Sequence, residues 1–327
     1  MRKGKGKGQH QVWILEEGRE QNMKLDALII GGGIAGLQGA IQLGRYGYRV
    51  LVVDANEGRS SMCRSYHNIL GWPDGIGGPE LRELGRMQAE RLGVRFLRGW
   101  ASDAQSIPGG FRVKVEGQEL EAKTMLLATG VKDRFPELPG LRGCLGITIY
   151  VCPDCDAYEI RGRSTLVLGS GEVGARMTLT LSRWTNRLVY LNHEQKPVSE
   201  NLLGELERRG ISHLPEQAER VLLEPGSSGL FQGLILRGGR VIEAERGFIA
   251  FGGNDVRSDL AAKLGATLHQ NRHVEVDPRT KETSVKGLWA AGDIGVHAEQ
   301  VTVAMGEGAI AAIWMHKALT KMEEEGS

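Results

Sequence analysis

The stretch that decides the fold spans residues 26–54 and reads DALIIGGGIAGLQGAIQLGRYGYRVLVVD. An apolar run, a glycine-rich turn, a segment of helical periodicity and a second apolar run follow one another, which is the pattern of a β-α-β unit. In the turn, Gly31 allows a tight bend, Gly33 lets a pyrophosphate approach the backbone, and Gly36 allows close helix packing. Asp54 ends the second strand and can accept hydrogen bonds from a ribose diol. The stretch predicts a dinucleotide site, and a purely structural glycine turn is the alternative.

The same order of elements returns at residues 164–192, STLVLGSGEVGARMTLTLSRWTNRLVYLN. Its turn carries Gly169, Gly171 and Gly174, but its second strand ends in Asn192 rather than in a carboxylate. A site for NAD favours an acid there, and a site for NADP favours arginines. Pyridine nucleotide binding, with Arg163, Arg187 or Lys196 folding back, and a retained but repurposed fold both stay open. The repeated unit predicts an α/β fold class with two Rossmann-like dinucleotide-binding domains.

A third motif is Cys152-Pro-Asp-Cys155, which Asp156 follows directly. Two thiols at this spacing can form a redox disulfide or supply half of a zinc site. No second pair with zinc-ligand spacing follows, so we favour the redox disulfide and predict no metal. Asp156 is interpreted either as the group that protonates a leaving thiolate or as a helix-start cap. Cys63 and Cys144 stand alone and are expected to be half-buried thiols.

A fourth signal is the run LWAAGD over residues 288–293, which ends in a carboxylate. Open α/β sheets bind ligands at the carboxyl ends of their strands, so Asp293 is a candidate site residue. A helix predicted to begin near Gln300 and Val301 and to run to Leu319 would direct its positive end toward the same edge. Ordinary strand-end and helix-start residues are the alternative interpretation.

Composition excludes several classes of protein. The chain has 327 residues, with 41 Lys+Arg against 40 Asp+Glu and a formal net charge of +1, which argues against a nucleic-acid partner. No stretch approaches the roughly 20 apolar residues of a membrane helix. Four cysteines in so long a chain do not form a secreted disulfide scaffold. Residues 1–23 are polar and rich in Gly and Lys, and we expect them to be a disordered extension without a targeting signal, so that the protein is cytoplasmic.

Together, the motifs resemble the low-molecular-weight thioredoxin reductases, a branch of the two-dinucleotide-domain flavoproteins. The resemblance rests on the ordered set GGGIAG, NILGWPDGIGGPEL, LLATG, CPDCD, GSGEVG, LWAAGD and QVTVAMGEGAIAA. It implies an FAD domain in two segments, residues 24–133 and 265–327. It also implies an inserted NAD(P)H-binding-like domain at residues 134–264 that carries the C-x-x-C motif.

Carried over by position, the resemblance also implies residue roles. Cys155 would face the flavin, Cys152 would attack an external disulfide, and Asp156 would act as acid and base. Residues around the ADP half of FAD would be Gly31, Gly33, Gly36 and Asp54, and those around its ribityl and isoalloxazine parts would be Asn68, Asp293, Gln300 and Val301. The implied partner is a thioredoxin-like or other disulfide substrate, and the implied assembly is a homodimer.

One departure from the family pattern bears on the electron donor, and two others bear on the surroundings of the flavin. The family carries H-R-R-x-x-x-R after the second Rossmann strand, where this chain reads LNHEQKP over residues 191–197. Glu299 stands where the family has Arg, and Ala157 stands where it has Gly. We therefore expect a donor other than NADPH, such as ferredoxin or a second flavin. An NADPH-dependent thioredoxin reductase, a dithiol oxidase that uses O₂, and a non-catalytic flavin-binding or zinc-bearing regulatory module are the alternatives.

Overall fold

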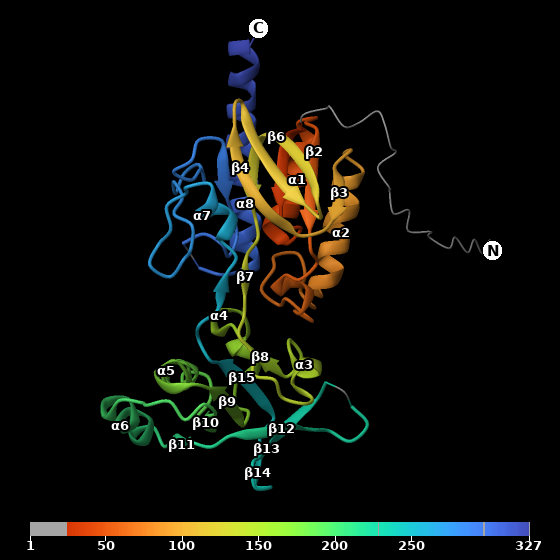
Figure 1. Cartoon of the computed structure of the whole chain (residues 1–327). Coiled ribbons are helices and arrows are strands. Elements are labelled where there is room, and N and C mark those ends of the chain that lie inside the picture. The colour runs from red at the N-terminus through yellow and green to blue at the C-terminus, as the bar shows by residue number, and fades with distance from the viewer. Residues whose placement is uncertain (1–24, 228, 297, 327) are drawn as a thin grey trace, which may run out of the picture.

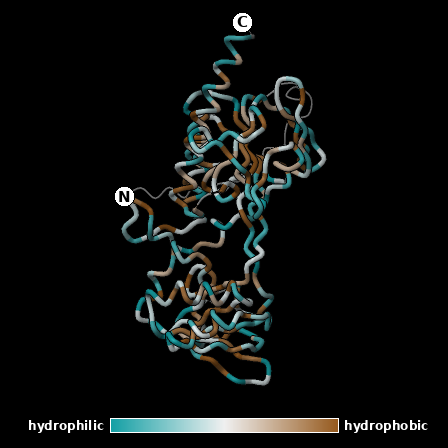
Figure 2. Tube along the Cα trace, turned by 90° about the vertical axis from the view of Figure 1, so that its left-hand side faces the viewer, coloured by the Kyte–Doolittle hydropathy of each residue, from teal (hydrophilic) through white to brown (hydrophobic). Residues whose placement is uncertain are grey.

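The computed structural model describes residues 25–227, 229–296 and 298–326, so the expected N-terminal extension lies outside the described residues. Two α/β bodies lie one above the other, joined by the short strands β7 (Val131–Lys132) and β16 (Asp255–Val256) (Figure 1). These two strands pair antiparallel. In the view of Figure 2 the connection is thin and mainly hydrophilic. The bodies are thus linked by a narrow two-stranded hinge.

The larger body contains a seven-stranded sheet in the order β3-β2-β1-β6-β5-β4, with β17 paired to β6. Strands β1, β2, β3, β6 and β17 run parallel, and β4 and β5 add an antiparallel meander. Strand bounds are β1 Leu25–Ile30, β2 Val50–Asp54, β3 Arg95–Arg98, β4 Ala101–Ile107, β5 Gly110–Val115, β6 Gln118–Leu127 and β17 Leu288–Ala290. Every residue of β1 is buried, as expected for a parallel strand covered on both faces.

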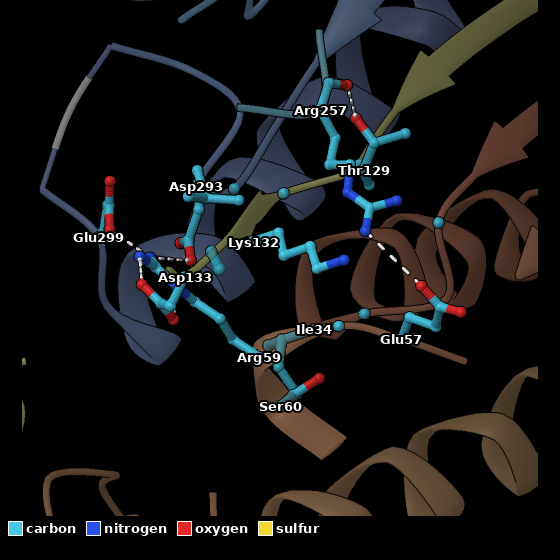
Figure 3. Close-up of a pocket in the computed structure, with 18 of the residues that line it drawn as sticks. Ile34, Glu57, Arg59, Ser60, Thr129, Lys132, Asp133, Arg257, Asp293 and Glu299 are labelled. Atoms are coloured by element: carbon cyan, nitrogen blue, oxygen red, sulfur yellow. Dashed lines mark hydrogen bonds and ion pairs between the residues drawn. The ribbon is translucent and has the colours of Figure 1, made fainter. Parts of the chain in front are cut away.

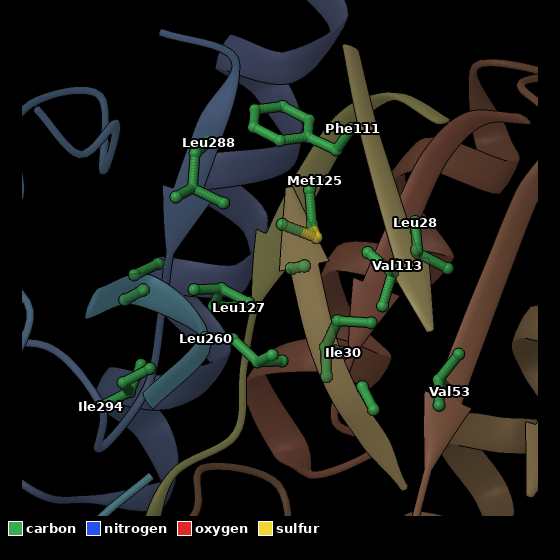
Figure 4. Packing of buried hydrophobic residues seen from close by; sticks show 14 of the residues in the cluster. Leu28, Ile30, Val53, Phe111, Val113, Met125, Leu127, Leu260, Leu288 and Ile294 are labelled. Carbon is green, nitrogen blue, oxygen red and sulfur yellow. The ribbon is translucent and has the colours of Figure 1, made fainter. Parts of the chain in front are cut away.

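Two layers cover this sheet. Helix α1 (Ile34–Arg45) packs on α8 (Val301–Gly326) and α2 (Gly78–Glu90), with the short helix η1 (Arg59–Ser61) beside α2. The approach of α8 to α1 is close, because a Cβ on Gly308 would lie 2.2 Å from the backbone oxygen of Ala35. On the other face, Leu28, Met125 and Leu288 belong to a hydrophobic core that also receives α7 (Asp259–Lys263) (Figure 4).

The smaller body has a parallel sheet in the order β11-β10-β9-β15-β8 and a separate antiparallel sheet in the order β12-β13-β14. The strands are β8 Ile149–Tyr150, β9 Thr165–Gly169, β10 Leu188–Asn192, β11 Ser212–Leu214, β12 Ala218–Leu223, β13 Phe231–Leu236, β14 Val241–Glu243 and β15 Arg246–Ala250. The helices are α3 Leu141–Cys144, α4 Pro153–Asp156, η2 Ala157–Ile160, α5 Gly171–Leu181 and α6 Glu200–Arg208. Strand β9, the second glycine turn and α5 repeat the plan of β1 and α1.

The predicted α/β class with two Rossmann-like units is confirmed, and three details differ. Helix α8 continues to Gly326, beyond the expected end at Leu319. Val256 and Leu260 belong to the core of the larger body, although residues 134–264 were assigned to the inserted domain. The chain thus returns to the larger body earlier than residue 265. Cys144 is fully buried rather than half-buried, because it ends α3 and packs into the hydrophobic core of the smaller body. Among the described residues, no helix is both long and apolar enough to span a membrane.

Candidate redox active site

A cavity of about 970 Å³ lies where the two bodies meet. The larger body contributes the first glycine turn and the edge of its sheet, and the smaller body contributes the C-x-x-C motif. The sequence-predicted residues among those that line it are Gly31, Gly33, Asp54, Asp293, Gln300 and Val301 from the larger body and Cys152, Cys155 and Asp156 from the smaller one. One cavity therefore joins the predicted nucleotide turn to the predicted redox pair.

The first glycine turn has the shape that a dinucleotide requires. Gly31 has φ +108°, and a Cβ there would lie 2.2 Å from the backbone oxygen of Ala128. A Cβ on Gly33 would meet nothing within 4 Å, so the backbone is open to the cavity at that point. Gly36 does not line the cavity, and its role is packing, since a Cβ there would lie 1.9 Å from the Gly31 oxygen. Helix α1 has no acidic residue in its first turn, which leaves its positive end available to an anion.

Asp54 ends β2 at the rim of the same cavity. One carboxylate oxygen accepts a hydrogen bond from Arg82 at 2.6 Å, and the other accepts one from the backbone N–H of Asn56 at 3.2 Å. These contacts fix the carboxylate, and each oxygen keeps a further lone pair. Nothing in the sequence motifs singled out Arg82, which comes from α2.

Cys152 and Cys155 form a disulfide. This is the pairing that the sequence favours over a zinc half-site. The backbone N–H of Cys155 donates to the Sγ of Cys152 at 3.2 Å. Both Sγ atoms lie 4.0 Å from the backbone oxygen of Glu299, which precedes α8 in the larger body. The disulfide of the smaller body thus contacts the loop that leads to Gln300.

Asp156 is the last residue of α4, and the N-cap of that helix is Cys152. Asp156 is instead the N-cap residue of η2, so its helix-start position is confirmed, but its side chain makes no capping hydrogen bond with the described residues. Burial raises the pKa of the Asp156 carboxyl to about 7, and the charge of Glu159 adds to the effect. At neutral pH this carboxyl is close to half protonated and can donate a proton beside the disulfide.

We expect the substitution Asp156→Asn to raise the free energy of unfolding progressively, relative to the parent, as pH rises from about 4 to 8. The carboxyl has its pKa raised from 3.8 to about 7 on folding, so its protonated form stabilises the fold at low pH and this contribution is lost as pH rises. The amide does not titrate. Urea denaturation of both proteins at pH 5 and pH 8 checks the sign, and a constant difference between them would contradict it.

Arg59 is the centre of a charge cluster that sequence reasoning missed. Its Nε and Nη2 donate to the two oxygens of Asp133 at 2.8 and 2.5 Å. Its Nη1 donates to Asp293 at 3.0 Å and also to Glu299 (Figure 3). Burial lowers the pKa of the guanidinium, but the hydrogen bonds and charge of Asp133 outweigh it, so the pKa is raised. Arg59 thereby ties the end of β7 to the loop beside the disulfide.

Asn68 is not among the residues that line the cavity. Its Nδ2 is buried and has no hydrogen-bond partner among the residues that the structure describes. Tyr66 and Cys63, which precede it, do line the cavity. Burial raises the pKa of the half-buried Cys63 thiol to about 11, and the charge of Asp156 raises it further, so this thiol stays protonated at neutral pH.

The second glycine turn is occupied by the chain itself. The backbone N–H of Gly171 donates to the Asn192 side chain at 2.9 Å, and the hydroxyl of Ser170 donates to Glu194 at 2.6 Å. A Cβ on Gly171 would lie only 3.1 Å from the Cβ of Lys196, so residues 196–197 cover the turn. None of Gly169, Gly171 and Gly174 lines the large cavity.

The cations that were candidates to fold back over this turn have other partners. Arg163 and Arg187 both bind Glu245, at 3.3 and 3.4 Å. Lys196 binds Glu194 at 2.9 Å, and Glu194 also binds Arg134. Glu194, two residues beyond the end of β10, is thus a carboxylate near the place where a ribose phosphate would lie, and it is already paired within the chain.

Comparison with known proteins places the chain in a family. Residues 25–308 match the family described as pyridine nucleotide-disulphide oxidoreductase. The chain is 28% identical over 296 residues to the thioredoxin reductase of Mycolicibacterium smegmatis, covering 88% of this chain and 94% of that protein. It is 29% identical over 299 residues to the bifunctional thioredoxin reductase/thioredoxin of Mycobacterium leprae, covering 88% of this chain but only 64% of that longer protein.

Among solved structures, that of HlmI superposes with a TM-score of 0.83 at 26% identity, covering 93% of this chain and 95% of HlmI. The fold, the C-x-x-C disulfide and the similar proteins all indicate the same family. The chain belongs to the pyridine nucleotide-disulphide oxidoreductase family and is a thioredoxin reductase-like flavoprotein disulfide oxidoreductase.

Proposed function

We propose that this protein binds FAD and passes two electrons through the Cys152–Cys155 pair to the disulfide of a partner, with an electron donor other than NADPH. The observation that carries the proposal is the single cavity that the first glycine turn and the cysteine pair both line. Bound FAD supplies a carrier that accepts and gives electrons in pairs. The thioredoxin reductase names of the relatives favour a thioredoxin-like partner.

The residues of the cavity suit FAD. The open backbone at Gly33 and the carboxylate of Asp54 would face the ADP half, with Gly31 and Gly36 shaping the turn. The ribityl and isoalloxazine parts would lie toward Asp293, Gln300 and Val301, the residues at the disulfide side. The buried Nδ2 of Asn68 lacks a partner within the described chain, and a ligand oxygen would satisfy it.

The chemistry at the thiols follows from their neighbours. In the reduced pair, the Cys152 thiolate attacks a partner disulfide, forming one S–S bond and releasing a partner thiolate that Asp156 protonates. The Cys155 thiolate then attacks the Sγ of Cys152, which releases the second partner thiol and restores the disulfide. The pKa of Asp156, about 7, suits this proton transfer near neutral pH.

The donor part of the proposal rests on the second glycine turn. A pyridine nucleotide needs the backbone donors and an unblocked helix start at Gly171, yet Asn192 takes that N–H and residues 196–197 cover it. Glu194 would also repel a 2′-phosphate. A reduced ferredoxin or a second flavin carrier is the donor class we propose. The homodimer stays a prediction of the resemblance, and the cytoplasmic location stays a prediction from the sequence.

Anaerobic titration of the purified yellow protein tests the proposal. We expect reduced ferredoxin to bleach the flavin absorbance, while NADPH and NADH leave it unchanged over minutes. Bleaching by NADPH within seconds would identify an ordinary NADPH-dependent reductase, and peroxide formation coupled to a dithiol would identify an oxidase. A colourless protein that binds no added FAD would contradict the flavin part.

A further inference from the structure

Five basic residues line the cavity, and two of them lack the close carboxylate partner that each of the other three has within the described residues. The three have a carboxylate within 3.0 Å, in the pairs Arg59–Asp133 at 2.5 Å, Lys263–Asp103 at 2.9 Å and Arg272–Asp259 at 2.6 Å. The remaining two are Lys132 and Arg257. They are the cations of the cavity that a bound anion can reach without breaking a close ion pair.

Neither residue has a tight acidic partner in the part of the chain that the structure describes. Arg257 lies 3.6 Å from Glu57 and 3.9 Å from Asp255, and both carboxylates are mostly exposed, so these pairs are weak. Among the described residues, no carboxylate lies within 4.0 Å of the Lys132 ammonium, although Asp255 is its cross-strand neighbour. Two positive charges therefore border the cavity with little compensation.

The hinge strands place both side chains on one side. Val131 pairs with Val256 and Lys132 with Asp255, and the N–H of Arg257 donates to the Gly130 oxygen at 3.0 Å. Since side chains alternate along a strand, Lys132 and Arg257 project from the same face of the two-stranded ladder. Figure 3 shows the Lys132 side chain near Ile34, the first residue of α1, and the Arg257 guanidinium directed toward Glu57.

Arg257 is also fixed in direction. Its guanidinium lies over the ring of Trp100, 4.6 Å from the ring centroid, and its backbone oxygen accepts a hydrogen bond from the Thr129 hydroxyl at 2.6 Å. Trp100 lines the same cavity. A guanidinium held by a ring loses less conformational entropy when it binds a ligand.

We propose that Lys132 and Arg257 bind the diphosphate of the dinucleotide, opposite the glycine turn and the positive end of α1. The inference rests on the proposed binding of FAD and adds two residues that no motif of the sequence indicates. A diphosphate carries negative charge for which the glycine turn offers only backbone donors and a partial helix charge. Lys132 and Arg257, whose charges are only weakly compensated, would supply the remaining positive charge that the diphosphate needs.

The test measures flavin binding to Lys132→Gln, Arg257→Gln and the double variant by quenching of flavin fluorescence. We expect the Kd for FAD to rise about tenfold for each single change and more for the double, since a charge-assisted contact is lost. ADP, which carries the diphosphate without the flavin ring, should lose affinity by the same factor. Riboflavin, which carries no phosphate, should bind all the variants equally. Arg257→Lys should recover part of the loss.

Lys263→Gln is the matched control, because Lys263 lines the cavity but is paired with Asp103. It should leave the Kd for FAD unchanged. Unaltered FAD affinity in the double variant, or an equal loss for riboflavin, would overturn the inference while wild-type FAD binding stands. Failure of the wild-type protein itself to bind FAD would instead overturn the proposed function.

Discussion

Replacement of Cys152 by Ser is expected to lower turnover of disulfide substrates by at least about a thousandfold, because the attacking thiolate is lost and serine does not form the mixed disulfide. Cys155→Ser should lower turnover as strongly, but it should block the later step in which the mixed disulfide is resolved. With Cys155 absent, the mixed disulfide at Cys152 has no resolving thiol and accumulates. Turnover is measured with a thioredoxin and with 5,5′-dithiobis(2-nitrobenzoate), and trapping is measured by intact mass.

The trapping experiment decides which cysteine attacks the partner and which faces the flavin, because the distances of the two Sγ atoms to the other body do not distinguish them. Both Sγ atoms lie 4.0 Å from the Glu299 oxygen and both border the cavity. The adduct mass should appear on Cys155→Ser and not on Cys152→Ser. Cys63→Ser is the matched control, since this thiol lines the same cavity but its raised pKa keeps it unreactive at pH 7. An adduct on Cys152→Ser alone would reverse the roles.

Most of the fold could be predicted from local patterns in the sequence. The turn at Gly31 needs a left-handed glycine, and the turn at Gly171 has φ +53°, so both are visible as glycine spacings. Asp293 was expected at a strand end and does line the cavity. Such features depend on a few residues that are neighbours in the sequence, so they can be recognised without the structure.

The Arg59 cluster could not be predicted in the same way. Arg59 is separated from Asp133 by 74 positions and from Glu299 by 240, and it begins the short helix η1, outside every sequence motif. Only the folded sheets bring the three residues together. The second turn shows the same limit, because Asn192 is visible in the sequence but the diversion of Arg163 and Arg187 to Glu245 is not.

Arg59→Met is expected to lower the free energy of unfolding by about 3–5 kcal/mol, because it leaves the buried carboxylate of Asp133 without its cation. The side chain of Asp133 is only 6% exposed, so water does not replace the lost guanidinium there. Urea denaturation at pH 7 in the same excess of FAD measures the change. The surface pair of Arg142 and Glu137, 72% and 87% exposed, provides the control, and Arg142→Met should cost less than about 0.5 kcal/mol.

A second variant separates the loss of the ion pair from loss of packing. If uncompensated charge is the cause, Arg59→Met combined with Asp133→Asn should be more stable than Arg59→Met alone, because the amide carries no charge to bury. The side-chain amide of Asn254 donates at 3.0 Å to the Asp133 oxygen that also accepts from Arg59. In Asp133→Asn, the amide oxygen of the new side chain can accept this hydrogen bond. A double variant no more stable than Arg59→Met would assign the effect to the lost side-chain volume. Unchanged stability of Arg59→Met would show that the cluster contributes nothing to the fold, and the hinge at β7 would then depend on its backbone pairing and on the packing of Val131 and Val256.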